Sequence, residues 1–81
     1  MTKTIHIQYF ALLREERGLS QETITMEVHT AHDLYVELKR KFGFRLDVDF
    51  LRVSINNEFK SWQTPLAHND RVVFIPPIAG G

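Results

Sequence analysis

The chain has 81 residues, of which 43% are apolar and 25% are charged, and its formal net charge at pH 7 is zero. That length holds one domain, and the neutral charge argues against nucleic acid as the main partner, since phosphate-binding proteins carry basic surfaces. The absence of cysteine excludes disulfides, thiolate metal sites and a cysteine nucleophile, and no apolar run approaches the roughly 20 residues that cross a bilayer.

A strand, a short helix and a second strand are predicted first. Residues 3–9 alternate apolar and polar side chains, which is the pattern of a half-buried strand. The good helix formers that follow predict a short helix over about residues 11–17, which Gly18 can end in the left-handed conformation. The alternation resumes over residues 22–28 and predicts the second strand. The start does not resemble the apolar stretch of a signal peptide, so we expect a cytoplasmic protein with no membrane contact.

The clearest element is a helix that begins after Thr30 and ends before Gly43. Thr30 is a favourable N-cap residue, and Asp33, three positions later, resembles the acidic member of a capping box. One buried face is predicted by apolar residues at helical spacing, namely Leu34, Tyr35, Leu38 and Phe42. Gly43 is a typical stop for such a helix.

The C-terminal half predicts a hairpin, an irregular loop and a last strand. The expected strands are residues 51–55, 58–60 and 71–75. Asn56 and Asn57 form the turn of the hairpin, because asparagine tolerates positive φ. Pro65 excludes a central strand from the loop, where Trp62 is expected to anchor against the core.

This order of elements predicts an α+β fold in which one main helix packs on one face of a mixed sheet. We expect a domain over residues 1–75 and an extended terminal segment over residues 76–81. Pro76 and Pro77 would stop the last strand and direct the chain away from it, because proline fixes φ and donates no backbone hydrogen bond.

The sequence ends in two glycines, Gly80 and Gly81, whose lack of a Cβ lets another protein close around the backbone. When extended, residues 76–81 span at most about 20 Å, which is long enough to enter another protein's active site. We expect the carboxylate of Gly81 to be the working group of the protein. The alternative is a frayed chain end with no function of its own.

Two segments resemble a known family. YFALLRE, from Tyr9 to Glu15, resembles the first-strand and first-helix signature of the small subunit of molybdopterin synthase, a ubiquitin-like sulfur carrier. PLAHNDRVVFIPPIAGG, from Pro65 to Gly81, resembles the C-terminal signature of that family. The sequence departs from the family at Asn69, where a glycine is usual, although asparagine supports a similar turn.

The resemblance implies a ubiquitin-like β-grasp fold and a sulfur-transfer chemistry centred on Gly81. In that family an activating enzyme, which resembles the ubiquitin-activating class, uses ATP to adenylate the terminal glycine. A sulfur donor enzyme then converts the adenylate to a thiocarboxylate, which supplies sulfur to cyclic pyranopterin monophosphate in a large subunit during molybdenum cofactor biosynthesis. The chain itself would bind no cofactor and would be the non-catalytic sulfur-donor subunit of a heterotetramer with two large subunits.

The resemblance also implies a docking surface on the sheet near the terminal segment. The expected partner-binding residues are Phe10, Arg14, Phe59, Ile75, Pro76, Pro77, Ile78 and Ala79, with Gly80 and Gly81 as the reacting end. Phe10 and Ile75 fall out of phase with the buried positions of their strands, so both can face away from the main helix. The alternative is that these two are ordinary core residues and that Arg14 is a solvated helix residue.

The residues alone leave other functions open. A sulfur carrier for thiamine thiazole synthesis has a similar end, and a ubiquitin-like modifier would join its terminal glycine to lysines of target proteins. A third alternative is a β-grasp binding module whose end is passive. His29 and His32 stand three positions apart, but no third ligand accompanies them, so we expect no metal site.

Overall fold

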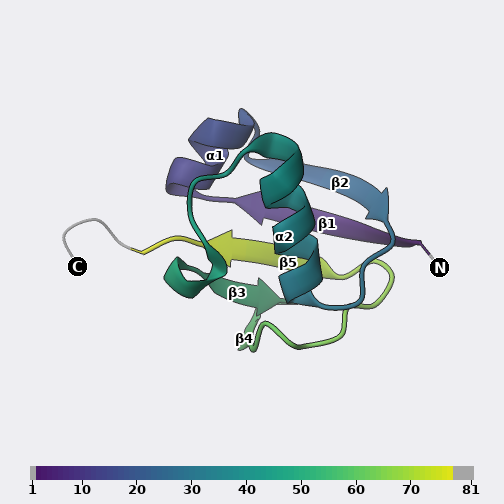
Figure 1. Cartoon of the computed structure of the whole chain (residues 1–81). Coiled ribbons are helices and arrows are strands. Elements are labelled where there is room, and N and C mark those ends of the chain that lie inside the picture. The colour runs from purple at the N-terminus through teal and green to yellow at the C-terminus, as the bar shows by residue number, and fades with distance from the viewer. Residues whose placement is uncertain (1, 78–81) are drawn as a thin grey trace.

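The elements follow one another in the order that the sequence predicts (Figure 1). They are β1 (Lys3–Tyr9), α1 (Ala11–Arg17), β2 (Gln21–Met26), α2 (Ala31–Phe42), the 3-10 helix η1 (Val48–Phe50), β3 (Arg52–Ile55), β4 (Glu58–Lys60) and β5 (Arg71–Ile75). This computed structural model describes residues 2–77, so Met1 and residues 78–81 lie outside the described part. The short helix after the first strand is confirmed, and η1 is an element that the sequence did not predict.

The strands form one five-stranded mixed sheet in the order β2-β1-β5-β3-β4. β1 and β5 pair in parallel at its centre, whereas the other neighbours pair antiparallel. The first and last strands therefore lie side by side, and α2 crosses one face of the sheet (Figure 1). This arrangement confirms the predicted α+β architecture with one main helix on one face.

The hydrophobic core lies between α2 and the sheet. The strands bury Ile5, Ile7, Tyr9, Val53, Ile55, Val72 and Phe74. From α2, the side chains of Leu34, Tyr35 and Leu38 are fully buried. The ring centroids of Tyr35 and Phe74 lie 5.1 Å apart, and Trp62 stacks on Phe74 at 6.0 Å. Trp62 is thus the loop anchor that the sequence predicts.

Both ends of α2 have the predicted geometry. The Thr30 hydroxyl accepts a hydrogen bond from the amide of Asp33 at 3.1 Å, and the Asp33 carboxylate accepts one from the amide of Thr30 at 3.3 Å. α2 ends at Gly43 and α1 at Gly18, with left-handed φ values of 73° and 79°. Within residues 2–77, neither helix is long and apolar enough to cross a bilayer.

Two strand boundaries differ from the prediction. β2 covers Gln21–Met26 instead of residues 22–28, because its partner β1 supplies no residue beyond Lys3. β3 starts one residue late, because the amide of Leu51 donates to the carbonyl of Val48 and closes η1. In both cases a neighbouring element decides where the strand stops or starts.

Candidate functional site

The face of the sheet opposite α2, here called the open face, carries every second residue of each strand. In β5, Val72 and Phe74 are buried toward α2, so Arg71, Val73 and Ile75 point the other way. The strand register adds Arg52, Ser54 and Phe59 from β3 and β4, and Thr4, His6, Gln8, Gln21, Thr23 and Thr25 from β1 and β2. The open face is therefore polar over β1 and β2 and more apolar toward β4 and the end of β5.

A hollow of about 530 Å³, here called the exit groove, lies where the chain leaves β5. Its lining residues are Asp49, Phe50, Leu51, Arg52, Phe59, Ile75, Pro76 and Pro77. Most of these side chains are apolar. The two prolines in the lining are the last residues that the structure describes, so the groove lies where the described chain ends.

Two phenylalanines of the exit groove lie largely in solvent. Phe59 is 65% exposed and Phe50 is 61% exposed. Burying a side chain of this size stabilises a fold by roughly 1.5–3 kcal/mol. Because Phe50 and Phe59 are mostly exposed to solvent, they contribute little of this free energy to the stability of the isolated domain. Aromatic residues are enriched in protein–protein interfaces, so these two exposed rings are candidate docking groups.

Three separate segments bring the groove together. Phe50 is carried by η1, whose turn is closed by hydrogen bonds of 3.0 Å from the amides of Phe50 and Leu51. Phe59 lies on β4, which returns through a turn at Asn56 and Asn57 with φ values of 52° and 72°. Ile75 is the last residue of β5 and pairs with Arg52 of β3. The sheet therefore fixes the positions of Phe59 and Ile75, and η1 fixes that of Phe50.

The groove brings together several of the predicted docking residues. Phe59, Ile75, Pro76 and Pro77 all line it. Phe10 is 41% exposed and stands outside the groove, although it follows the residue that pairs with Phe74 and so lies at the same end of the sheet as Ile75.

The remaining predicted residues lie elsewhere. Arg14 is an exposed residue of α1 and lines none of the exit groove. Ile78, Ala79, Gly80 and Gly81 lie outside the described residues. The predicted roles of all these residues in docking or sulfur transfer stay predictions.

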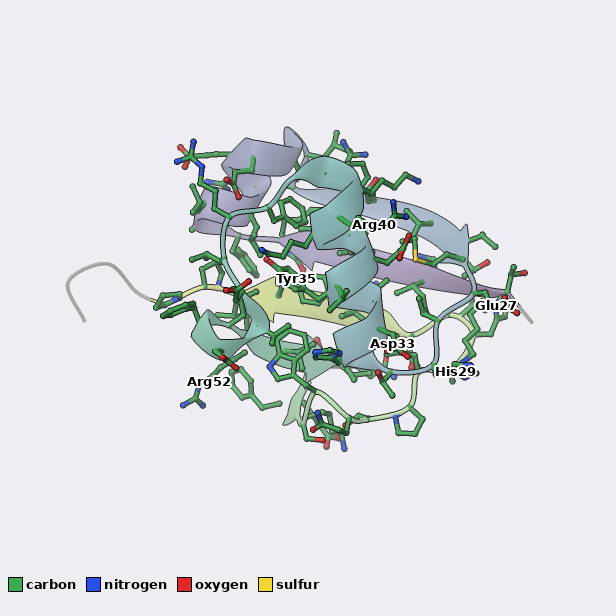
Figure 2. The ribbon with its side chains drawn as sticks, in the orientation of Figure 1. Glu27, His29, Asp33, Tyr35, Arg40 and Arg52 are labelled. Carbon is green, nitrogen blue, oxygen red and sulfur yellow. The ribbon has the colours of Figure 1, made fainter. Side chains whose placement is uncertain are left out.

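Sequence reasoning missed Phe50 and Arg52. Nothing in the periodicity around Phe50 indicates an exposed aromatic residue, because η1 is a single turn between irregular segments. Arg52 alternates with buried Leu51 and Val53, which places it on the open face, but its position beside Ile75 depends on strand pairing. Its guanidinium lies 5.9 Å from the ring centroid of Phe59. Figure 2 shows Arg52 projecting outward on the side where the chain leaves the sheet.

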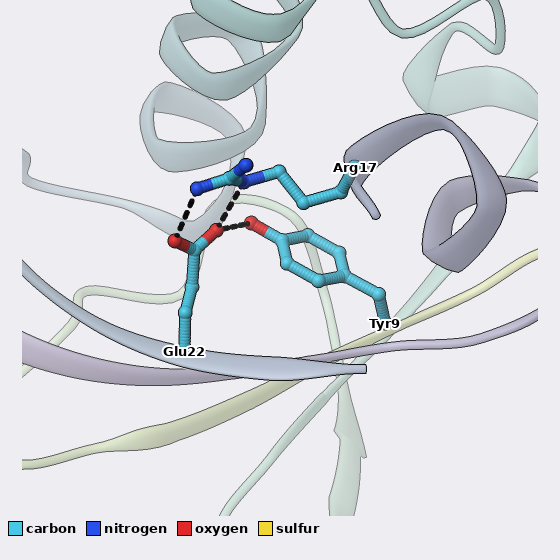
Figure 3. A network of polar contacts seen from close by, with 3 residues as sticks. All are labelled: Tyr9, Arg17 and Glu22. Atoms are coloured by element: carbon cyan, nitrogen blue, oxygen red, sulfur yellow. Dashed lines mark hydrogen bonds and ion pairs between the residues drawn. The ribbon is translucent and has the colours of Figure 1, made fainter. Parts of the chain in front are cut away.

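A polar network on the other side of the sheet holds α1 in place (Figure 3). The hydroxyl of Tyr9 donates to Glu22 Oε2 at 2.6 Å, and Arg17 donates to both oxygens of Glu22 at 2.8 Å. These hydrogen bonds, above all those from Arg17, lower the pKa of Glu22, and burial raises the pKa of Tyr9. The guanidinium of Arg17 also lies 3.9 Å from the ring centroid of Phe42, which is partly buried and packs against the core.

The exit groove contains little that could perform chemistry. Asp49 and Arg52 are its charged lining residues. Elsewhere, burial raises the pKa of Tyr35, whose hydroxyl donates to the carbonyl of Leu46 at 2.6 Å inside the fold. Among residues 2–77, no three His, Asp or Glu side chains are grouped to hold a metal ion. The geometry of the groove suits binding of another protein.

Comparison with known proteins places the chain in a family. Residues 7–81 match the ThiS family, whose members are ubiquitin-like sulfur carriers. The chain belongs to the ThiS family. Comparison with curated proteins gives no match.

Solved structures agree with this assignment. A putative molybdopterin converting factor subunit 1 from Pyrococcus furiosus is similar at 27% identity and a TM-score of 0.76, over 94% of this chain and 99% of that one. SAMP1 from Haloferax volcanii has 21% identity and a TM-score of 0.76, over 96% and 99% of the two chains.

A third likeness is to a chain in the complex of subunits 1 and 2 of the molybdopterin-converting factor from Helicobacter pylori 26695. It has 20% identity and a TM-score of 0.64, over 96% of this chain and 99% of that one. At identities this low, the similarity to SAMP1 and to the Helicobacter pylori chain supports only the fold. Together the three structures confirm the ubiquitin-like β-grasp fold of this ThiS-family chain.

Proposed function

We propose that this ThiS-family chain is the sulfur carrier subunit of molybdopterin synthase. The observation that carries the proposal is the exit groove, where exposed Phe50 and Phe59 line the same hollow as Pro76 and Pro77, the first residues of the expected terminal segment. A carrier has to dock before its end can be used by another protein, and docking surfaces have an apolar centre with a polar rim. The 27% identity to a putative molybdopterin converting factor subunit 1 supports this pathway among those open to the family.

The reacting group is the carboxylate of Gly81. A carboxylate is a poor electrophile, so one of its oxygens first attacks the α-phosphate of ATP on an activating enzyme, and pyrophosphate leaves. A sulfur donor then displaces AMP from the acyl adenylate and leaves a thiocarboxylate. Its sulfur is a softer nucleophile than the oxygen it replaces and forms a carbon–sulfur bond to cyclic pyranopterin monophosphate in the large subunit. Water then cleaves the acyl–sulfur bond and restores the Gly81 carboxylate. Gly80, which has no side chain, lets these enzymes close around the backbone.

The docking residues are those of the exit groove together with Phe10 and Arg14 at the junction of β1 and α1. The partner is the large subunit, with two copies of each subunit in the complex. A complex of subunits 1 and 2 of the molybdopterin-converting factor from Helicobacter pylori contains a chain of the same fold, which supports a partner of this kind.

The intact mass of the chain tests the proposal. We expect incubation with an activating enzyme, ATP and a sulfur donor to add the mass of one oxygen replaced by sulfur, located on Gly81. A chain lacking Gly81 should show no such gain, and Gly81→Ala should show less. Addition of the large subunit and cyclic pyranopterin monophosphate should then return the mass to its starting value.

Three other outcomes would change or overturn the proposal. If a thiocarboxylate forms but the large subunit cannot use its sulfur, the chain is a sulfur carrier of another pathway, such as thiamine thiazole synthesis. Adducts between Gly81 and lysines of other proteins, without sulfur transfer, would make the chain a ubiquitin-like modifier. An unchanged mass, with the activating enzyme proven active on another carrier, would sink the central claim.

A further inference from the structure

The open face is cationic, although the chain as a whole is neutral. Among the strand positions of this face within residues 2–77, the charged side chains are Arg52 and Arg71, and neither Asp nor Glu occurs there. Arg71 lies on β5 next to His6 of β1, and Arg52 lies on β3 next to Ile75. The two arginines thus stand toward opposite ends of β5.

Within residues 2–77, both arginines lack a carboxylate partner, whereas five of the ten Lys and Arg residues have one. The cations that form ion pairs are Arg17, Lys39, Arg40, Arg45 and Lys60, and none of them lies on the open face. In the described part of the chain, neither Arg52 nor Arg71 forms an ion pair. Their charge is available to a second molecule.

Asp70 precedes Arg71 in the chain and Glu22 lines the same hollow as Arg71, and both carboxylates are already engaged. Asp70 accepts hydrogen bonds from the amide of Ala67 at 2.7 Å and from the side chain of Asn56 at 2.9 Å. Glu22 is held by Arg17 and by the hydroxyl of Tyr9. Neither of these two carboxylates is therefore free to turn toward the guanidinium of Arg71.

Arg71 also borders a hollow of about 240 Å³, here called the basic hollow. Ile7 and Glu22 also line it, but strand alternation turns their side chains to the other face, where Tyr9 and Arg17 hold the Glu22 carboxylate. The side chains of His6, Gln8, Gln21 and Thr23 line it from the open face, and His6 Nδ1 and the Thr23 hydroxyl share a hydrogen bond of 3.0 Å. These are hydrogen-bonding groups without negative charge, so together with a guanidinium they suit a carboxylate ligand. The basic hollow lies over β1 and β2, away from the apolar exit groove.

We propose that Arg71 and the basic hollow receive an Asp or Glu side chain of the docking protein, and that Arg52 contacts a second carboxylate beside the exit groove. The inference rests on the proposed function, so the docking protein is the molybdopterin synthase large subunit. Its docking surface then carries an apolar patch bordered by carboxylates. Contacts toward both ends of β5 fix the direction of that strand on the partner, and with it the direction in which Pro76 and Pro77 follow the strand.

The test compares Arg71→Glu and Arg71→Gln with Arg40→Glu in binding to the large subunit from the same organism. Arg40 is an exposed cation on α2, away from the open face. Arg40→Glu therefore changes the net charge by the same amount as Arg71→Glu without altering the open face. We expect Arg71→Glu to weaken binding about tenfold or more, mainly through slower association, and Arg71→Gln by about threefold. Arg40→Glu should stay within about twofold of the parent chain. The salt dependence of association should fall with both Arg71 variants and stay unchanged with Arg40→Glu.

The controls separate the possible failures. Backbone contacts between Arg71 and Asn56 do not involve the guanidinium, so Arg71→Gln should keep the thermal unfolding temperature of the parent chain. If the parent chain binds the large subunit and all three variants bind it equally well, this inference is overturned, but the proposed function is not affected. No binding by the parent chain overturns the proposed partner itself. Self-association of the parent chain that Arg71→Glu abolishes would assign the basic hollow to a second copy and overturn the inference.

Discussion

Phe59 and Phe74 show how one residue type takes two roles through strand alternation. In β3, Val53 pairs with Phe74 and its neighbour Ser54 pairs with Phe59. Adjacent residues of a strand point to opposite faces, so Phe74 enters the core and Phe59 reaches the open face. Phe74 has no exposed surface and contacts the rings of Tyr9, Tyr35 and Trp62, whereas Phe59 is 65% exposed.

This contrast predicts two unequal truncations. Phe74→Ala should lower the free energy of unfolding by about 3–5 kcal/mol, since it leaves a cavity among aromatic rings. Phe59→Ala should change it by less than about 1 kcal/mol, because the side chain is mostly hydrated already. Urea unfolding of the two variants beside the parent chain measures both values. A loss for Phe59→Ala as large as that for Phe74→Ala would show that Phe59 serves the fold and would remove it from the docking surface.

At the scale of elements, local signals decided how much could be predicted. α2 could be placed almost to the residue, because Thr30, Asp33 and Gly43 act within one turn of each helix end. The ends of β2 and β3 could not, because pairing with β1 and the closure of η1 set them. η1 itself leaves no periodic pattern in three residues, so the exposed side chain of Phe50 followed only from the structure.

The attachment of α1 should depend on pH through Glu22. Its pKa is lowered below the ordinary value of 4.5, first by hydrogen bonds from Arg17. A carboxyl group with a lowered folded-state pKa contributes stability that is present above the unfolded-state pKa and is lost as pH falls through the folded-state pKa. Glu22→Gln should therefore cost about 1–3 kcal/mol near neutral pH, and the difference from the parent chain should shrink below about pH 4.5.

Denaturant unfolding of both chains from about pH 7 down to about pH 3 gives the difference directly. Glu58→Gln serves as the control, because the Glu58 side chain is 73% exposed and its ion pair with Lys60 is open to solvent. A Glu22→Gln difference that does not change with pH would mean that the network in Figure 3 acts through shape and hydrogen bonding rather than through charge.

At the scale of the whole molecule, the exit groove combines parts that are far apart in the sequence. Alternation and the family resemblance together predicted Phe59, Ile75 and the two prolines, all of which line it. Phe50 and Arg52 join them only because β5 lies between β1 and β3 and ends beside η1. The paired strands likewise reveal the cationic open face, since a single strand shows alternation but not which neighbours share its face.

Phe50 gives the sharpest test of the exit groove as a docking surface, because its exposed ring contributes little to the stability of the fold. We expect Phe50→Asp to leave the unfolding free energy within about 1 kcal/mol of the parent chain, since exposed substitutions cost little. Binding to the large subunit should weaken by at least about tenfold, because a charge would enter the apolar centre of the interface. Sedimentation of the mixed subunits should then show free small subunit beside the large subunits.

Val36→Asp is the matched control, since Val36 is also exposed, at 46%, but lies on α2, which covers the other face of the sheet. It should bind like the parent chain. Equal weakening by the two variants would point to a general loss of structure or to docking through α2. Equal binding by both would place the partner away from the exit groove, and the exposure of Phe50 and Phe59 would then need another cause.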